Sequence, residues 1–235
     1  MRDNMWRVNH ATGAVAPNEP FADRAAAGRI LGQAVRDQLG AEAGEVVVLG
    51  LPRGGVSVAA PVARALDAPL DVLVVRKIGV PGQPELAMGA LARDSVVRNT
   101  DVIAALRISD AAFDAAAAAE REVAEARERD YRGVHAHEAL SGRVAVVTDD
   151  GLATGATARA AVQALTQSPD DRPARVVLAV PVAPADTLAA LRPLVDEIIC
   201  LATPTPFYAV GAWYRDFTQV SDAEVRRLLR RGEVG

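Results

Sequence analysis

Short apolar runs and longer segments with helical spacing alternate along this chain. The runs are rich in valine and leucine, which is typical of strands that are buried on both faces of a parallel sheet. Five such strands are expected, at residues 45–49, 70–75, 144–147, 175–180 and 197–201. Apolar residues recur at helical spacing before and between them, at residues 27–39, 56–66, 158–165 and 184–191. The alternation predicts an α/β fold with a doubly wound parallel sheet of about five strands.

The parts outside this alternation predict the domain organisation. Residues 1–20 are polar and aperiodic, so we expect a loose N-terminal arm ahead of an α/β core at residues 21–202. Residues 203–235 are expected to form a small C-terminal hood that closes with a helix. A further long helix is expected from residue 109 or 110 to about residue 128, with charged residues four positions apart on a solvated face.

Residues 78–89 are the most irregular segment between expected elements. Their sequence, IGVPGQPELAMG, carries three glycines and two prolines, which are too many breakers for a regular element. The segment is therefore expected to be a flexible loop, and the apolar stretch LAMGAL is expected to form a β-ribbon with residues 95–98. Glu85 is the one acid in the loop and a candidate contact for a ligand.

Composition narrows the function classes. The 235 residues suit one α/β domain with a small appendage, and 50% hydrophobic with 4% aromatic residues indicates a core of alanine, valine and leucine. The net charge is −4 without a basic stripe, which argues against nucleic-acid binding. No apolar run approaches the ~20 residues of a membrane span, so a cytoplasmic protein is expected. The single cysteine, Cys200, excludes an intrachain disulfide and is expected in the core.

An acidic pair and a loop of small residues follow the expected strand at residues 144–147. Asp149 and Asp150 are ionised at neutral pH, and two adjacent carboxylates suit the two hydroxyls of a ribose or a metal ion. Glycines let main-chain N–H groups approach a ligand, and a helix start directly after them favours an anion. An ordinary strand-to-helix turn is the alternative. The loop residues of interest are Gly151, Ala153, Thr154, Gly155, Ala156 and Thr157.

A second glycine loop follows the expected strand at residues 45–49. Gly54 and Gly55 leave main-chain amides exposed at a helix start, and the Arg53 side chain can bind two phosphate oxygens at once. Arg76 and Lys77 stand at the end of the next expected strand, where open α/β sheets bind their ligands. The alternatives are a glycine-rich helix entry with a surface arginine and a solvated strand end.

The sequence VVTDDGLATGAT resembles the phosphoribosyl pyrophosphate signature of type I phosphoribosyltransferases, with Thr148 where that family usually has Val or Ile. The resemblance implies that Asp149 and Asp150 hold the ribose 2′- and 3′-hydroxyls and that residues 153–157 cradle the 5′-phosphate. RGG at residues 53–55 resembles the family's pyrophosphate loop, which often contains a non-proline cis peptide. The pair at residues 76–77 resembles the basic pair ahead of the family's mobile loop.

The resemblance implies a phosphoribosyltransferase that uses phosphoribosyl pyrophosphate and displaces pyrophosphate at ribose C1 with a nitrogen nucleophile. Mg²⁺ is expected on the pyrophosphate, with Asp149 and Asp150 as further metal contacts. Arg53, Lys77 and the two aspartates are the expected catalytic residues. A sensing protein that keeps the pocket without chemistry is the alternative, and a hydrolase lacks a residue that would activate water. The acceptor is not identified, and the oligomeric state is left open, although members of the family are often homodimers.

Two other clusters carry weaker expectations. Five aromatic residues gather near the C-terminus, and they are interpreted as the core of the hood rather than a stacking platform, with Phe207 or Tyr208 as the ring to face the site. The five are Phe207, Tyr208, Trp213, Tyr214 and Phe217. His135 and His137 suggest a metal site, but a polar loop is favoured because no third ligand lies nearby in sequence.

Overall fold

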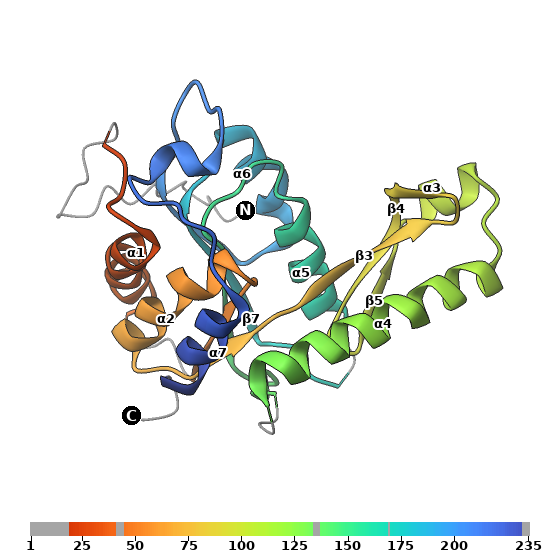
Figure 1. The fold of residues 1–235 in the computed structure, drawn as a ribbon, viewed down its shortest axis with the longest axis horizontal. Coiled ribbons are helices and arrows are strands. Elements are labelled where there is room, and N and C mark those ends of the chain that lie inside the picture. Colours follow the sequence, from red (N-terminus) through yellow and green to blue (C-terminus); the bar gives the residue numbers. More distant parts are fainter. Residues whose placement is uncertain (1–18, 41–44, 134–136, 169, 232–235) are drawn as a thin grey trace, which may run out of the picture.

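The computed structural model describes residues 19–40, 45–133, 137–168 and 170–231, and its centre is a five-stranded parallel sheet (Figure 1). The strand order is β2-β1-β6-β7-β8, which confirms the expected doubly wound sheet. The strands are β1 (Val46–Gly50), β2 (Leu70–Val72), β6 (Val144–Thr148), β7 (Arg175–Val182) and β8 (Glu197–Ala202). Every neighbouring pair in this sheet is parallel.

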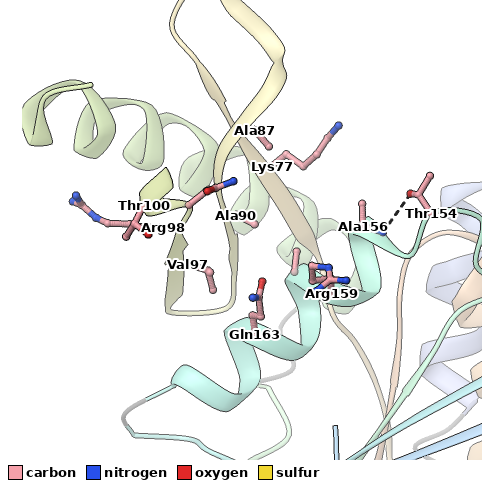
Figure 2. Close-up of a pocket in the computed structure, with 13 residues that line it drawn as sticks. Lys77, Ala87, Ala90, Val97, Arg98, Thr100, Thr154, Ala156, Arg159 and Gln163 are labelled. Atoms are coloured by element: carbon pink, nitrogen blue, oxygen red, sulfur yellow. Dashed lines mark hydrogen bonds between the residues drawn. The ribbon is translucent and has the colours of Figure 1, made fainter. Parts of the chain in front are cut away.

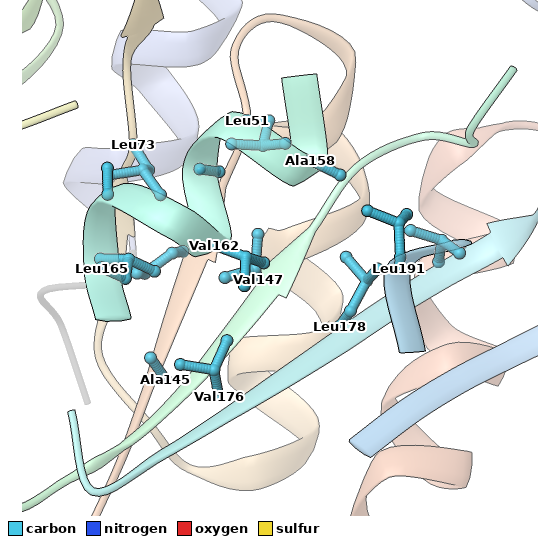
Figure 3. Close-up of a cluster of buried hydrophobic side chains, with 14 of the residues drawn as sticks. Leu51, Leu73, Ala145, Val147, Ala158, Val162, Leu165, Val176, Leu178 and Leu191 are labelled. Carbon is cyan, nitrogen blue, oxygen red and sulfur yellow. The ribbon is translucent and has the colours of Figure 1, made fainter. Parts of the chain in front are cut away.

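Helices cover both faces of the sheet because its strands are apolar on both sides. Alternate residues of one strand enter different cores, as Val48 does on one face and Leu49 on the other. The first face is covered by α1 (Arg24–Leu39) and α2 (Gly54–Leu66), and the second by α5 (Ala156–Gln167) and α6 (Ala185–Leu191). Figure 3 shows the second core, where Val162 and Leu165 of α5 pack onto Val147.

The two helices of the first face pack closely because α1 places glycines against α2. A Cβ at Gly28 would lie 2.5 Å from Pro61 Cγ, and one at Gly32 would lie 2.7 Å from Ala65 Cβ. The Asp23 side chain caps α1 by accepting a hydrogen bond from the Ala26 amide at 2.6 Å, as the sequence predicts.

A second, antiparallel sheet extends beside the first with the long helix α4 along it (Figure 1). Its strands are β3 (Val75–Val80), β4 (Gln83–Ala92) and β5 (Ser95–Arg98), in that order. The remaining helices are α3 (Thr100–Ala105), α4 (Asp110–Arg132) and α7 (Asp222–Arg231), and the 3₁₀ turns are η1 (Arg192–Leu194) and η2 (Val210–Trp213). A third core, which includes Met88, Phe113 and Val225, joins this sheet to α4 and α7. We call the three strands β3, β4 and β5 the ribbon.

The prediction of a flexible loop at residues 78–89 is wrong, because most of these residues lie in β3 and β4. The turn of this hairpin is at Gly82, whose φ of 79° favours glycine, so the breakers fall where the chain reverses. The pairing shifts register on either side of Gly79, and a Cβ there would lie 2.8 Å from the Pro84 carbonyl oxygen. The expected pairing with residues 95–98 is confirmed, with Leu91 opposite Val96.

The prediction of a single strand at residues 70–75 is also wrong in its extent. It ends at Val72, and Val75 already belongs to the second sheet, so one apolar run serves two sheets. α4 continues to Arg132, beyond the expected end, and α3 was not expected. Burial raises the pKa of Cys200 to about 12, in agreement with its interpretation as a core residue. Residues 1–18 and His135 lie outside the described residues.

None of the helices that the structure describes is long and apolar enough to cross a membrane.

Candidate functional site

The two predicted loops leave neighbouring strands at the same edge of the sheet. Gly50 at the end of β1 lies opposite Thr148 at the end of β6, and the Leu51 amide donates a hydrogen bond to the Thr148 carbonyl oxygen at 2.9 Å. The carboxyl ends of both strands point the same way because the strands are parallel. The glycine loop at residues 51–55 and the acidic loop at residues 149–157 therefore emerge side by side, where open sheets bind ligands.

The two loops are fitted to each other through glycine. A Cβ at Gly55 would lie 2.6 Å from the Thr148 carbonyl oxygen and 2.9 Å from Asp149 Cα, and one at Gly54 would overlap the Asp150 carboxylate. Both glycines therefore serve close approach of the two loops. The peptide bond between Pro52 and Arg53 is cis, the feature that the resemblance to the pyrophosphate loop implies.

Asp149 is held in an environment that disfavours its charge. Its Oδ1 accepts a hydrogen bond from the Asp150 amide at 2.9 Å. Burial and the neighbouring Asp150 charge raise the pKa of Asp149 well above its usual range, and that amide and the Arg24 charge offset only part of the rise. Hydroxyl groups or a cation supplied by a ligand would stabilise the charged form and lower this pKa again.

Asp150 has two partners that sequence reasoning missed. Arg24, the first residue of α1, donates from Nε to Asp150 Oδ2 at 2.7 Å. The Tyr214 hydroxyl donates to the Asp150 carbonyl oxygen at 2.5 Å, and burial raises the pKa of Tyr214, which keeps that donor protonated. Neither residue stands in a recognisable motif, and the only signal was the place of Tyr214 in the aromatic cluster.

The loop at residues 151–157 has the conformation of an anion site. Gly155, with a φ of 70°, precedes α5 and has no side chain to cap it. The Ala156 amide donates a long hydrogen bond to Thr154 Oγ1 at 3.4 Å, and the other amides of the helix start are available to an anion. The Thr187 hydroxyl donates to the Ala153 carbonyl oxygen at 2.7 Å and so anchors the loop to α6. A Cβ at Gly155 would lie 2.8 Å from Thr187 Cγ2, so this glycine is needed for space as well as for conformation.

The basic residues of the site differ in how far their charges are compensated. The Arg53 side chain donates no hydrogen bond within the described part of the chain. Arg76 and Lys77 do not end a parallel strand as expected but lie inside β3. The Arg76 guanidinium pairs with Glu120 of α4 at 2.7 Å, whereas Lys77 is exposed and makes no ion pair with any residue that the structure describes. Lys77 is therefore the better available anion ligand of the two.

A cavity of about 460 Å³ lies between α5 and the ribbon and reaches the loop at residues 151–157 (Figure 2). Three of its lining residues are cations and none is an acid. Arg98 pairs with Asp110 and Asp114 of α4 at 2.6 Å each, so Lys77 and Arg159 supply the charge that favours an anion. Arg159 and Gln163 of α5 line the cavity in addition to residues that the motifs predicted. The full lining is Lys77, Ala87, Gly89, Ala90, Val97, Arg98, Asn99, Thr100, Thr154, Ala156, Arg159, Ala160 and Gln163.

The aromatic cluster and His137 have structural partners. Tyr214 is 6% exposed and packs with Phe21 and Ala27, as expected for a hood core, while Tyr208 is 84% exposed. His137 hydrogen-bonds Glu128 of α4 at 3.1 Å. Within the described ranges, no group of three or more His, Cys, Asp or Glu side chains converges as a metal site. Glu85 is exposed in the first part of β4, away from the lining of the cavity.

The sheet order, the paired loops at its carboxyl edge and the acidic pair define the type I phosphoribosyltransferase fold. The family model described as phosphoribosyl transferase domain matches residues 20–203, and the chain belongs to this family. The crystal structure of TT1426 from Thermus thermophilus is similar over 90% of this chain and 98% of that chain, with 42% sequence identity and a TM-score of 0.78.

Two curated relatives come from Mycobacterium tuberculosis, strains CDC 1551 / Oshkosh and ATCC 25618 / H37Rv. They are named "Putative phosphoribosyl transferase MT0597" and "Putative phosphoribosyl transferase Rv0571c", and each is 51% identical over 212 residues. The match covers 90% of this chain but 46% of each relative, so the chain spans about half the length of the curated relatives it matches.

Proposed function

We propose that this chain is a phosphoribosyltransferase that binds phosphoribosyl pyrophosphate across the two loops. The ribose hydroxyls bind Asp149 and Asp150, and the 5′-phosphate binds the amides of residues 153–157. The pyrophosphate binds the loop at residues 53–55 with Lys77. The direct packing of Gly54 and Gly55 against the two aspartates carries the proposal, because it joins a sugar-binding pair to an anion-binding loop.

Mg²⁺ fits this arrangement as a companion of the pyrophosphate. Among the described residues, no third His, Cys, Asp or Glu joins Asp149 and Asp150 as a metal site, which suits an ion that keeps its waters and is held mainly by phosphate oxygens. Bound there, Mg²⁺ would neutralise charge on the leaving group.

The reaction is a displacement at ribose C1. A bond forms between C1 and a nitrogen of the acceptor, the bond from C1 to the pyrophosphate oxygen breaks, and pyrophosphate leaves with the electron pair while the nitrogen loses a proton to solvent. Arg53 and Lys77 stabilise the charge that develops on the leaving group, and the aspartates fix the ribose for in-line attack. The substrates supply the reacting atoms, so the chain acts by positioning and electrostatics.

Calorimetric titration with phosphoribosyl pyrophosphate, with and without Mg²⁺, tests this function. We expect Mg²⁺-dependent micromolar binding, on the order of −8 kcal/mol, that is lost in the Asp149→Asn/Asp150→Asn double variant. Asp94→Asn/Asp101→Asn is a matched control, because it removes the same charge from two exposed positions. No binding by the wild type, or equal binding by the Asp149/Asp150 variant, would contradict the proposal.

Transfer itself is tested by pyrophosphate release in the presence of nitrogenous acceptors. Release that requires an acceptor supports the enzyme. Tight binding without release for purine, pyrimidine and other nitrogenous acceptors would favour the sensing role instead.

A further inference from the structure

Arg24 lies outside the predicted motifs and binds a side-chain oxygen of the acidic pair, whereas Tyr214 binds the main chain of Asp150. The Arg24 side chain is 11% exposed and that of Asp150 is 16% exposed, and the two are joined by the 2.7 Å bond from Nε to Oδ2. The residues are 126 positions apart in sequence, so only the packing of α1 against the carboxyl edge of the sheet brings them together.

The Arg24 guanidinium is itself held in one orientation by the C-terminal segment. Its NH1 group donates to the Thr218 carbonyl oxygen at 2.9 Å, and its centre lies 3.8 Å from the centroid of the Phe217 ring. Tyr214 stacks on Phe217 at 5.1 Å between ring centroids and donates to the Asp150 main chain. A planar guanidinium fixed at three points is a preorganised donor for a carboxylate.

The contact with Arg24 leaves the two carboxylate oxygens of Asp150 in different environments. Oδ2 is occupied by Arg24 and lies against the position that a Gly54 side chain would take. Apart from the carboxyl of its neighbour Asp149, which hydrogen-bonds the Asp150 side chain, no residue that the structure describes donates a hydrogen bond to Oδ1. The oxygen that remains for a ligand hydroxyl is therefore Oδ1, and a carboxylate fixed on one side loses little rotational freedom when it binds.

We propose that Arg24 is a positioning residue for sugar binding: it fixes Oδ2 of Asp150 and so presents Oδ1 to a ribose hydroxyl of the bound sugar phosphate. This inference rests on the proposed function, because it assumes that the acidic pair binds ribose. It extends the site to α1 and to the C-terminal segment. Arg24 acts through Asp150 and touches no substrate.

The test is a double-mutant cycle read by calorimetry, with ribose 5-phosphate as the probe. The variants are Arg24→Gln, Asp150→Asn and the combination of both. We expect Arg24→Gln to weaken ribose 5-phosphate binding roughly tenfold, the usual effect of losing a hydrogen bond to a charged group. In the Asp150→Asn background, Arg24→Gln should weaken ribose 5-phosphate binding by less than about twofold. The effects of two residues in contact are coupled, so the second change adds little once the first has removed the contact. Binding of magnesium pyrophosphate alone should change by less than about twofold in Arg24→Gln.

Two further variants separate positioning from a general effect on the fold. Arg29→Gln removes the same charge from an exposed position of α1 and should bind as the wild type does. Arg24→Lys keeps the charge without the planar fork and should fall between wild type and Arg24→Gln. Thermal unfolding is recorded for every variant, and Arg24→Lys replaces Arg24→Gln in the cycle if the latter does not fold.

Each outcome decides one of the two proposals. Wild-type protein that binds no ribose 5-phosphate and no phosphoribosyl pyrophosphate overturns the proposed function, and the role of Arg24 with it. Wild-type binding with an unchanged affinity in Arg24→Gln overturns the role of Arg24 alone. An equal loss in the Asp150→Asn background also overturns it, since Arg24 would then act on the fold and not through Asp150.

Discussion

Single glycines decide whether the two ligand loops can meet. Gly55 is the second residue of α2, and the two atoms nearest to its added Cβ belong to the main chain of Thr148 and Asp149, which cannot rotate away as a side chain could. Gly54 faces the carboxylate of Asp150, a side chain that the hydrogen bond from Arg24 holds in place. Glycines are common where a strand ends, but these two are required because the loops that follow two different strands contact each other here.

Replacing Gly55 with alanine should therefore damage both stability and the site. The added Cβ would meet the Thr148 carbonyl oxygen at 2.6 Å, and we expect a loss of about 1–3 kcal/mol in the free energy of unfolding together with weaker sugar pyrophosphate binding. Chemical denaturation and calorimetry measure the two effects. Gly40→Ala is the control: its φ is 63° and nothing lies within 4 Å of its added Cβ, so only stability should fall, by about 1 kcal/mol. Normal binding by Gly55→Ala would contradict close packing of the loops.

At the scale of elements, α4 is joined to β2 by charges that are largely shielded from water. Asp71 is 3% exposed and receives ion pairs at 3.6 Å from Arg93 and 3.4 Å from Arg132. His137 lies 3.4 Å from Asp71 and hydrogen-bonds Glu128 at 3.1 Å. Burial acts to raise the pKa of Asp71, but the His137 hydrogen bond and the Arg132 charge outweigh it and leave that pKa lowered.

The same cluster predicts a pH dependence of stability. Burial acts to lower the pKa of His137, but hydrogen bonds to Asp71 and Glu128 outweigh it and leave the pKa raised above 6.5. Because the folded state binds the proton more tightly, the stabilisation is fully present below the unfolded pKa of about 6.5 and is lost as pH rises through the higher folded value.

Thermal unfolding of wild type and His137→Gln between pH 5.5 and 8.5 measures this effect, where the limits are about one to two units either side of the unfolded pKa. We expect the variant to be about 1 kcal/mol less stable at the acid end, after allowance for the one-third exposed ring, and the difference to shrink at the alkaline end. A difference that grows with pH would contradict the sign, and none at any pH would remove His137 from the cluster.

At the scale of the whole molecule, the ribbon brings Lys77 to the cavity beside the loop at residues 151–157. The ribbon belongs to the second sheet and the loop to the first, so their approach depends on how α5 packs against β4 and β5. Arg76 is adjacent in sequence but pairs with Glu120 of α4. Neighbouring cations of one strand thus face different partners, as alternation along a strand requires.

This difference predicts unequal effects of two equal charge changes. Lys77→Gln should weaken binding of magnesium pyrophosphate roughly three- to tenfold, because its charge is uncompensated within the described structure. Arg76→Gln is the matched control and should change it by less than about twofold, since Glu120 already neutralises that charge. Calorimetry at low and at ~1 M salt should show the Lys77 effect shrinking as the charge is screened. Equal losses in both variants would contradict the assignment.

Much of the fold could be predicted because its signals are local. The valine runs of β1 and β6 indicate buried strands, and Asp23 and Ser109 cap two of the expected helices. The predictions failed where one local sequence pattern is compatible with two different structures. An apolar run from residue 70 to 75 crosses from one sheet to the other, and the breakers of residues 78–89 fall at the turn and register shifts of a hairpin. α3 was missed although Asn99 caps it.

The sequence by itself determined the acidic pair, the two glycine loops and the strand before each, because turn chemistry and apolar runs act between neighbouring residues. Tertiary structure alone decided that Arg24 and Tyr214 reach Asp150 and that Arg76 turns to α4 while Lys77 does not. Such contacts join residues 44 to 126 positions apart. Their partners depend on how helices pack against sheets, and no local pattern records that packing.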